Sequence, residues 1–204
     1  MDATVDPRPL YGGEPLPIGS KGRLSSGWWG MIAVIATEAS LFAYLLFSYF
    51  YVAAQTVGRW PPSGPPDLTL SVPGTIVLLL GSATMWWGEK GVRAGRRGQL
   101  LFGLGSSVLL AIAFVVLEGF EWSHKSFSLT SNAYSSLYFT VTGFHLLHVI
   151  VGALMLAVLF VWTLLDYFGA RRHSTVSIGV IYWHFVTAVW IAVFISFYVA
   201  PRLQ

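Results

Sequence analysis

Six acidic and histidine side chains lie within long apolar stretches of this 204-residue sequence. They are Glu38, Glu118, Glu121, His145, His148 and His184. A charge at the centre of a lipid bilayer costs from roughly 3 to more than 10 kcal/mol, so each of these residues is a candidate for a functional role. Carboxylates and imidazoles can share protons, and imidazoles can also ligate metal ions or haem iron. The sequence has no cysteine, which excludes thiolate metal sites, disulfides and cysteine nucleophiles.

Depth along a helix groups four of these residues together. With a rise of about 1.5 Å per residue, Glu38 lies about 15 Å beyond Trp28, near the midplane of a bilayer. The same arithmetic places His145, His148 and His184 at a similar depth in later helices. We therefore predict a buried polar layer of these four residues, in which Glu38 pairs with His148 or His145 and no full charge remains in hydrocarbon. The alternative is a protonated Glu38 bonded to a backbone or serine oxygen.

The other two carboxylates belong to a separate cluster. Glu118 and Glu121 lie roughly 27 to 30 Å along their helix, which assigns them to the outer interface of the membrane. Lys125 follows Glu121 by four residues, a spacing that predicts an ordinary ion pair at a water-exposed helix end. For Glu118 we expect a contact with another helix or another subunit.

Three other functions are possible for such a sequence, namely a metal site, a haem site and a transporter. His145 and His148 share a helix face, but no second carboxylate or thiolate stands at a suitable spacing, so we predict hydrogen bonds rather than a metal site. Haem held by His148 and His184 is a stronger rival, because the two lie at one depth on different helices. Bulky rings such as Phe144 oppose haem, which would also leave Glu38 without a role. A transporter should show repeats or broken helices, and the sequence has no internal repeat.

The composition requires that membrane helices position these residues. Hydrophobic residues make up 55% of the chain and charged residues 10%, and the mean hydropathy is +0.65. Soluble domains carry about a quarter charged residues, so a soluble globule is excluded. The net charge of +3 comes from dispersed basic residues that form no stripe, and we therefore expect no nucleic-acid partner.

Five apolar runs are each long enough to cross about 30 Å of hydrocarbon, which takes about 20 residues. They are residues 28–54, 68–87, 100–122, 135–165 and 176–200. We predict an all-α bundle of five transmembrane helices over residues 28–204, preceded by a polar tail of residues 1–27 that is rich in Pro and Gly. Nine of the 12 Lys and Arg residues lie in the tail and in segments 88–99 and 166–175. This asymmetry places the N-terminus inside and the C-terminus outside.

Small side chains predict where the helices approach closely, because such residues let backbones meet in a membrane. The expected packing positions are Ala33, Ala36 and Ser40 in the first run and Gly143 and Gly152 in the fourth. In the first run, Glu38 falls on the opposite face from these small residues. Glu38 is therefore not expected to point into the tightest helix contact.

Several segments resemble subunit III of the haem-copper oxidases in its short, five-helix form. They are GWWGMIAVIATEASLFAYLLFSYFY (27–51), LEGFEW (117–122), YFTVTGFHLLHVIVG (138–152) and YWHFVTAVWIAVF (182–194), and the resemblance covers all five runs. By this resemblance Glu38 corresponds to the buried carboxylate of the family and His145 and His148 to its paired histidines. His184 corresponds to the histidine of its last helix.

The resemblance implies an accessory subunit in the cell membrane (plasma or inner membrane), without catalytic residues or redox centres of its own. Haem and copper are then expected in the partner subunit I, which reduces O2 to water while pumping protons. Subunit II and a small subunit IV are further expected partners. The family member binds phospholipid in an interhelical cleft, stabilises subunit I and supports proton uptake.

The sequence departs from the family pattern at two positions. Thr187 stands where the family usually has Asp, and Glu118 stands where a Gln is common. The family also divides by electron donor. The residues of the GFH and YWHF motifs favour cytochrome c as the donor of the complex. The alternatives are a subunit of a quinol oxidase and a nitric-oxide-reductase-associated subunit, which are of similar length.

Overall fold

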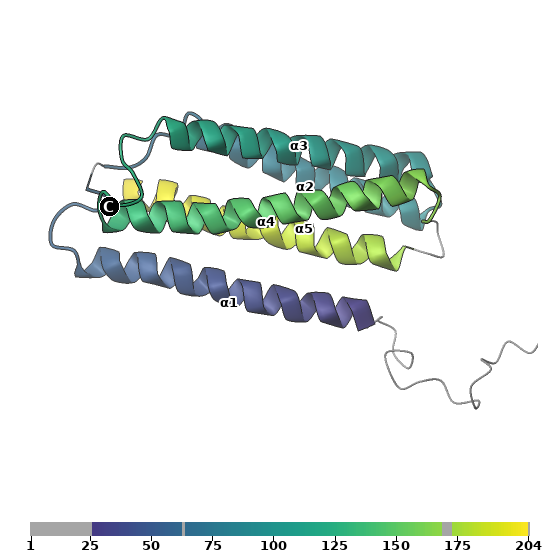
Figure 1. The fold of residues 1–204 in the computed structure, drawn as a ribbon, viewed down its shortest axis with the longest axis horizontal. Coiled ribbons are helices and arrows are strands. Elements are labelled where there is room, and N and C mark those ends of the chain that lie inside the picture. Colours follow the sequence, from purple (N-terminus) through teal and green to yellow (C-terminus); the bar gives the residue numbers. More distant parts are fainter. Residues whose placement is uncertain (1–25, 63, 169–172, 204) are drawn as a thin grey trace, which may run out of the picture.

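Five long helices account for most of the structure, a computed structural model that describes residues 26–62, 64–168 and 173–203 (Figure 1). The helices are α1 (Ser26–Gln55), α2 (Ser71–Arg93), α3 (Arg97–Ser123), α4 (Ala133–Leu164) and α5 (Ser174–Phe194). A π-helical turn, η1 (Ile195–Val199), and a 3-10 turn, η2 (Ala200–Arg202), continue α5. Each predicted run coincides with one helix. The predicted polar tail lies almost wholly outside the described residues.

Four of these helices are long and apolar enough to cross a membrane, namely α1, α3, α4 and α5 with its continuation. The remaining helix, α2, is also long enough, since 23 residues span about 35 Å, but it is less apolar. It extends to Arg93, beyond the predicted end at residue 87. Composition alone therefore assigns four spans, and the fifth depends on how α2 packs.

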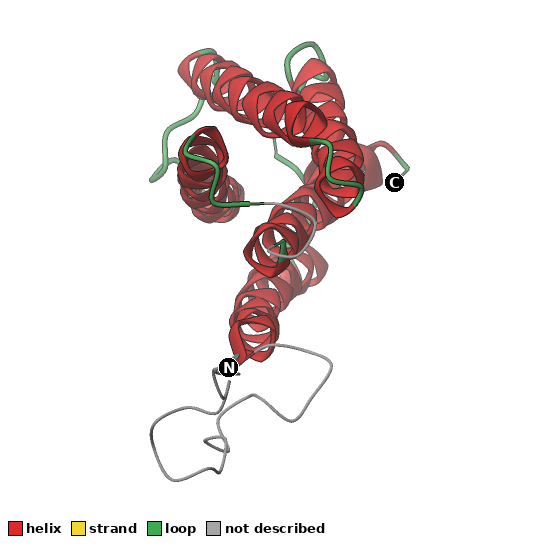
Figure 2. Ribbon diagram, turned by 90° about the vertical axis from the view of Figure 1, so that its right-hand side faces the viewer, coloured by secondary structure: helices red, strands yellow, loops and turns green. Residues whose placement is uncertain are grey.

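The helices form a bundle in which α1 lies at one edge (Figures 1 and 2). Helices α2 and α3 form the closest pair, and α4 and α5 join them to α1, which contacts α4 and α5. Of the four membrane-length helices, α5 is the most buried and α1 the least. The bundle therefore leaves most of the surface of α1 open to lipid or to another protein.

Glycines set the close approach of α2 to α3. A Cβ atom on Gly103 would lie 2.7 Å from the Cα of Gly88 and 2.8 Å from the carbonyl oxygen of Thr84. Both neighbours belong to the backbone, so they cannot move aside as a flexible side chain would. In a membrane, where lipid is as apolar as leucine, such backbone proximity is a main source of helix association.

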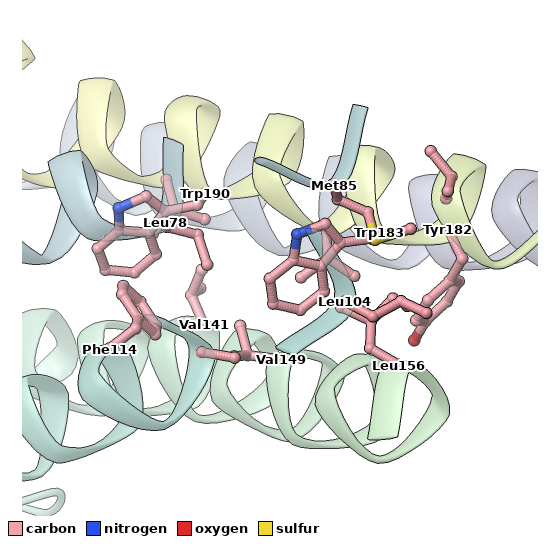
Figure 3. Packing of buried hydrophobic residues seen from close by; sticks show 14 of the residues in the cluster. Leu78, Met85, Leu104, Phe114, Val141, Val149, Leu156, Tyr182, Trp183 and Trp190 are labelled. Carbon is pink, nitrogen blue, oxygen red and sulfur yellow. The ribbon is translucent and has the colours of Figure 1, made fainter. Parts of the chain in front are cut away.

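Aromatic side chains of α5 fill the space between α2, α3 and α4 (Figure 3). Trp183 and Trp190 are fully buried, and Trp190 packs edge-to-face on Phe114 of α3. A Cβ atom on Gly152 of α4 would lie 3.0 Å from the Trp183 ring, as expected for a close helix contact. A Cβ atom on Gly143 would lie 3.6 Å from Trp122 of α3, an ordinary contact distance.

Within this chain, no described helix covers the predicted packing face of the first helix. Ala33, Ala36 and Ser40 are exposed, and α1 instead turns its opposite face, with Phe42, toward α4 and α5. The large rings at that contact hold the helices apart, so small residues are not needed there. Small-residue spacing indicates that a helix can approach another closely, but it does not say which helix.

Candidate functional site

Glu38 of α1 and His148 of α4 form a hydrogen-bonded pair between the two helices. The Oε2 atom of Glu38 lies 2.9 Å from Nε2 of His148, and Nδ1 of His148 lies 2.6 Å from the carbonyl oxygen of Phe144. A carbonyl oxygen only accepts, so Nδ1–H donates to it and Nε2 faces the carboxyl group. One further proton then joins Nε2 and Oε2, and the pair is neutral whichever atom carries it. A neutral pair avoids the cost of an isolated charge in hydrocarbon.

The pair borders a groove between α1, α4 and α5. The groove has a volume of about 540 Å³, and its other walls are apolar side chains of α1, α4 and α5. They include Met31, Val34, Leu41, Leu147, Val151 and Met155. Side-chain exposure is 30% for Glu38 and 11% for His148, so a molecule in the groove could reach the pair. An apolar groove with one polar pair suits a lipid chain better than a polar substrate.

His145 serves a different contact from its neighbour in the sequence. Its ring is fully buried against Trp190 and Phe114, and Nε2–H donates to the carbonyl oxygen of Val186 at 3.2 Å. This bond ties α4 to the backbone of α5. The predicted bond to a neighbouring helix is therefore present, with the backbone as its acceptor.

His184 faces away from the other three residues of the predicted layer. Its Nδ1 lies 2.5 Å from the hydroxyl of Ser82 in α2, and the half-buried ring borders a pocket near Trp86 and Glu89. Only Glu38 and His148 are joined directly, so the four residues do not form one connected layer. Counting the rise per residue predicts that the four residues lie at a similar depth, but it does not give the direction in which each side chain points.

The ring-nitrogen contacts also decide how well haem fits. Both ring nitrogens of His148 already have partners within this chain, and Nδ1 of His184 has Ser82. A haem between these two rings would have to displace the Glu38 carboxyl group or the Phe144 carbonyl group. Across residues 26–62, 64–168 and 173–203, no three His, Asp or Glu side chains lie close enough to hold a metal ion. Ligation of haem iron by His148 would therefore break one of its hydrogen bonds within this chain.

The outer carboxylates form a buried network instead of a water-exposed pair. Glu121 Oε1 accepts from Lys125 at 2.8 Å, from the Tyr198 hydroxyl at 2.5 Å and from the Tyr138 hydroxyl at 3.1 Å. Side-chain exposure is 6% for Glu121 and 10% for Lys125, so the prediction of a water-exposed pair is wrong. The reason is tertiary, because α4 and the turn η1 bring the two tyrosines over the end of α3.

Glu118 bonds within its own helix, where the sequence had suggested a contact with another helix or subunit. Its Oε1 accepts from the indole N–H of Trp122 at 3.0 Å, and the residue is 3% exposed. Sequence reasoning missed Tyr138 and Tyr198 as partners of this cluster. The available signal was that Tyr138 near the start of one helix and Tyr198 near the end of the next carry polar tips at the same end of an antiparallel pair.

Thr187, at the position where the resemblance predicts Asp, bonds within its own helix. It is buried, and its hydroxyl donates to the carbonyl oxygen of Trp183 in the same helix at 3.1 Å. The indole N–H of the next tryptophan, Trp190, donates to the hydroxyl of Thr75 in α2. Trp183 and Trp190 of α5 thus pack in the core, and Trp190 also makes one polar contact with α2.

Comparison with known proteins gives one consistent result. The sequence model of the family described as cytochrome c oxidase subunit III matches residues 23–201. Cytochrome c oxidase subunit 3 of Homo sapiens is 32% identical over 177 residues, which covers 83% of this chain and 68% of the human protein. The protein of the same name from Dugong dugon is 34% identical over the same shares. The one from Mus musculus is 32% identical over 195 residues, which covers 92% of this chain and 73% of the mouse protein.

Proposed function

The chain belongs to the cytochrome c oxidase subunit III family, and we propose that it is the accessory, non-redox subunit of a proton-pumping terminal oxidase. The family match over residues 23–201 carries this proposal. Each of the six ionisable residues singled out within the helices has a hydrogen-bond partner in this chain. This arrangement supports a structural subunit, with haem and copper in the partner subunit that reduces O2 to water.

The proposed topology is five transmembrane helices in the cell membrane, with the N-terminus inside and the C-terminus outside. The packing of α2 supports its role as the fifth span. Along its length α2 meets α3 at Gly74 against Phe114, at Gly81 beside Leu110, and at Gly88 against Gly103. A helix that follows a membrane-spanning neighbour over this distance must lie at the same depth. The lower hydropathy of α2 is tolerable because this face is covered by protein rather than lipid.

Contact with subunit I is proposed for the exposed small-residue face of α1, namely Ala33, Ala36 and Ser40. Small residues favour close helix contacts in membranes, and no described helix of this chain covers them. Subunit II and a small subunit IV complete the proposed complex. The apolar groove beside Glu38 and His148 is proposed to hold a phospholipid chain, and through these contacts the chain stabilises subunit I and supports proton uptake.

Cytochrome c is the proposed electron donor. The relatives that match this chain carry the name cytochrome c oxidase subunit 3. The residues of the GFH and YWHF segments favour the same donor. The donor itself binds elsewhere in such a complex. A partner subunit with a copper-binding cupredoxin domain would therefore identify cytochrome c as the donor.

Purification of the tagged chain from native membranes in mild detergent tests the proposal. We expect a haem-copper subunit I to co-purify, with a haem absorbance spectrum and a cupredoxin-bearing subunit II. Ala36→Leu should reduce this co-purification, whereas Leu154→Ala, at an exposed position of α4, should not. A stable chain that purifies without any haem-copper partner would refute the assignment.

A further inference from the structure

A second cavity, unrelated to the groove at Glu38, opens at the end of the bundle where α3 ends and α4 begins. Its volume is about 640 Å³, within the range of small-molecule sites. The segment before α2 (Gly64 to Leu70) forms one side, and the end of α3 with the residues that follow it forms the other. We call this cavity the outer pocket. In the proposed topology it lies at the level of the outer lipid headgroups.

The charges of the outer pocket favour a cationic ligand. Asp67 projects an exposed carboxylate, and its two oxygens accept from the Thr69 hydroxyl at 2.9 Å. That bond holds the pKa of Asp67 below its ordinary value, so the carboxylate is ionised at neutral pH. Glu121 supplies a second carboxylate, and Lys125 supplies one ammonium group that is already bonded to Glu121. Asp67 has no ion-pair partner at 4 Å or less among the described side chains, and Lys125 is the pocket cation whose charge also lowers its pKa.

Aromatic rings complete the recognition of a cation. Phe120, Phe127 and Tyr134 all border the outer pocket, and ring faces attract ammonium groups when water is partly excluded. Tyr134 is 2% exposed, and its hydroxyl has no hydrogen-bond partner among the described residues. That hydroxyl is enclosed by protein, so recognition of a ligand in the outer pocket rests on Asp67 and the aromatic rings.

An apolar track leads from the outer pocket toward the middle of the membrane. Leu109, Ile112, Val116 and Phe120 are exposed on α3 at spacings of three and four residues, so they share one helix face. Phe120 lies both on this face and at the pocket. A ligand with a charged head and long apolar chains could therefore place its head in the pocket and its chains along α3.

We propose that the outer pocket binds the ammonium headgroup of a zwitterionic phospholipid of the outer leaflet, with Asp67 as the main partner of the ammonium group. Phosphatidylethanolamine is the lipid class that fits, because its primary ammonium donates hydrogen bonds to a carboxylate as well as contacting the rings. The lipid chains lie on the exposed face of α3. This inference rests on the proposed membrane topology, but it does not depend on the electron donor or on the groove at Glu38.

Lipid titration of the purified complex tests the outer pocket, with native mass spectrometry to count bound lipids. The probes are phosphatidylethanolamine and phosphatidylglycerol with identical chains, since phosphatidylglycerol has no ammonium group. Asp67→Asn keeps the shape of the side chain and removes its charge. We expect it to weaken phosphatidylethanolamine binding by about fivefold and to leave phosphatidylglycerol binding unchanged, as for the loss of one exposed ion pair.

Asp166→Asn is the matched control, because it removes an exposed carboxylate after α4, at the other end of that helix from the outer pocket. This variant should bind both lipids as the unaltered chain does. Glycerophosphoethanolamine, which lacks the chains, should compete only at much higher concentration if the α3 face contributes. Equal competition by this soluble compound would refute the proposed lipid and indicate a small amine instead.

Two further results would overturn the proposal. One is phosphatidylethanolamine binding that is the same in Asp67→Asn as in the unaltered chain. The other is a photoreactive amino acid at position 126, beside the pocket, that cross-links to a partner polypeptide and not to lipid. The haem spectrum of the same samples reports the oxidase assignment separately, so failure of one proposal is distinguishable from failure of the other.

Discussion

The shared proton of Glu38 and His148 explains how two ionisable residues lie in a membrane helix bundle at low cost. Nδ1 of His148 is fixed by the carbonyl group of Phe144, so the ring presents Nε2 to α1 in one orientation. The Phe42 ring packs edge-to-face on the His148 ring, with 5.1 Å between the ring centroids, and limits rotation of the imidazole. The pair thus joins α1 to α4 by a hydrogen bond beside the packing of Phe42, and we call this pair the latch.

Substitution of Glu38 tests the latch. Glu38→Gln retains a donor that a neutral His148 accepts at Nε2, so O2 reduction and subunit retention should stay nearly unchanged. Glu38→Ala leaves Nε2 of His148 without a partner, at a cost of about 1–3 kcal/mol, and should lower the temperature at which the chain dissociates from the complex. Thr37→Ala is the control, because Thr37 is exposed and bonds only to its own helix at Val34. Equal dissociation temperatures for Glu38→Ala and Thr37→Ala would contradict a structural role.

At the scale of helices, two kinds of contact hold the bundle together. Helices α2 and α3 meet through backbone at Gly88 and Gly103, whereas α4 and α5 meet through the Trp183 ring over Gly152. The first contact depends on the absence of side chains and the second on one glycine that leaves room for an indole. Neither contact tolerates a larger side chain, because interiors packed at this density have little room for added atoms.

Gly103→Ala and Gly152→Leu should therefore destabilise the chain. The alanine Cβ would lie 2.7 Å from the backbone of α2, and the leucine would overlap the Trp183 ring. Overpacking of this kind costs about 1–3 kcal/mol, and more where backbone must move. Thermal unfolding in detergent measures the loss.

Gly119→Ala and Gly119→Leu are the matched controls, since a Cβ at Gly119 meets no atom within 4 Å. Neither should lower the unfolding temperature. If Gly103→Ala were as stable as Gly119→Ala, the close contact of α2 and α3 would be wrong.

At the scale of the whole molecule, the positions of the helix ends allow a direct test of the proposed membrane topology. The end of α1, the start of α2, the end of α3 and the start of α4 gather at one end of the bundle (Figure 1). Because the chain has no cysteine, each introduced thiol is its only one. Val57→Cys and Ser131→Cys should react with a membrane-impermeant maleimide in intact cells. Ala94→Cys, at the other end of α2, should react only after permeabilisation.

Labelling of both Val57→Cys and Ala94→Cys from the same side would contradict α2 as a span. Labelling of Ala94→Cys alone in intact cells would reverse the proposed orientation. The labelled chain is identified by its mass, so cysteines of other subunits do not interfere.

The sequence by itself determined the helices, their approximate ends and the position of each polar residue along its helix. A run of about 20 apolar residues allows only a helix in lipid, because every backbone N–H and C=O must be paired within the segment. Since each residue adds a fixed rise, position along a helix follows from counting. That is why Glu38 is predicted from the sequence to pair with His148 or His145, and the structure joins it to His148 at 2.9 Å. The motifs likewise identified the family.

Only the tertiary structure decided which face of each helix meets another. In a soluble protein the polar side of a helix reveals the buried side, but in a membrane both lipid and protein present apolar contacts, so the pattern carries little information. For this reason the small-residue face of α1 proved to be exposed, and Glu121 with Lys125 proved to be buried under Tyr138 and Tyr198. The outer pocket arises from segments more than 50 residues apart in sequence, at Asp67 and Phe120, and no local pattern encodes such a meeting.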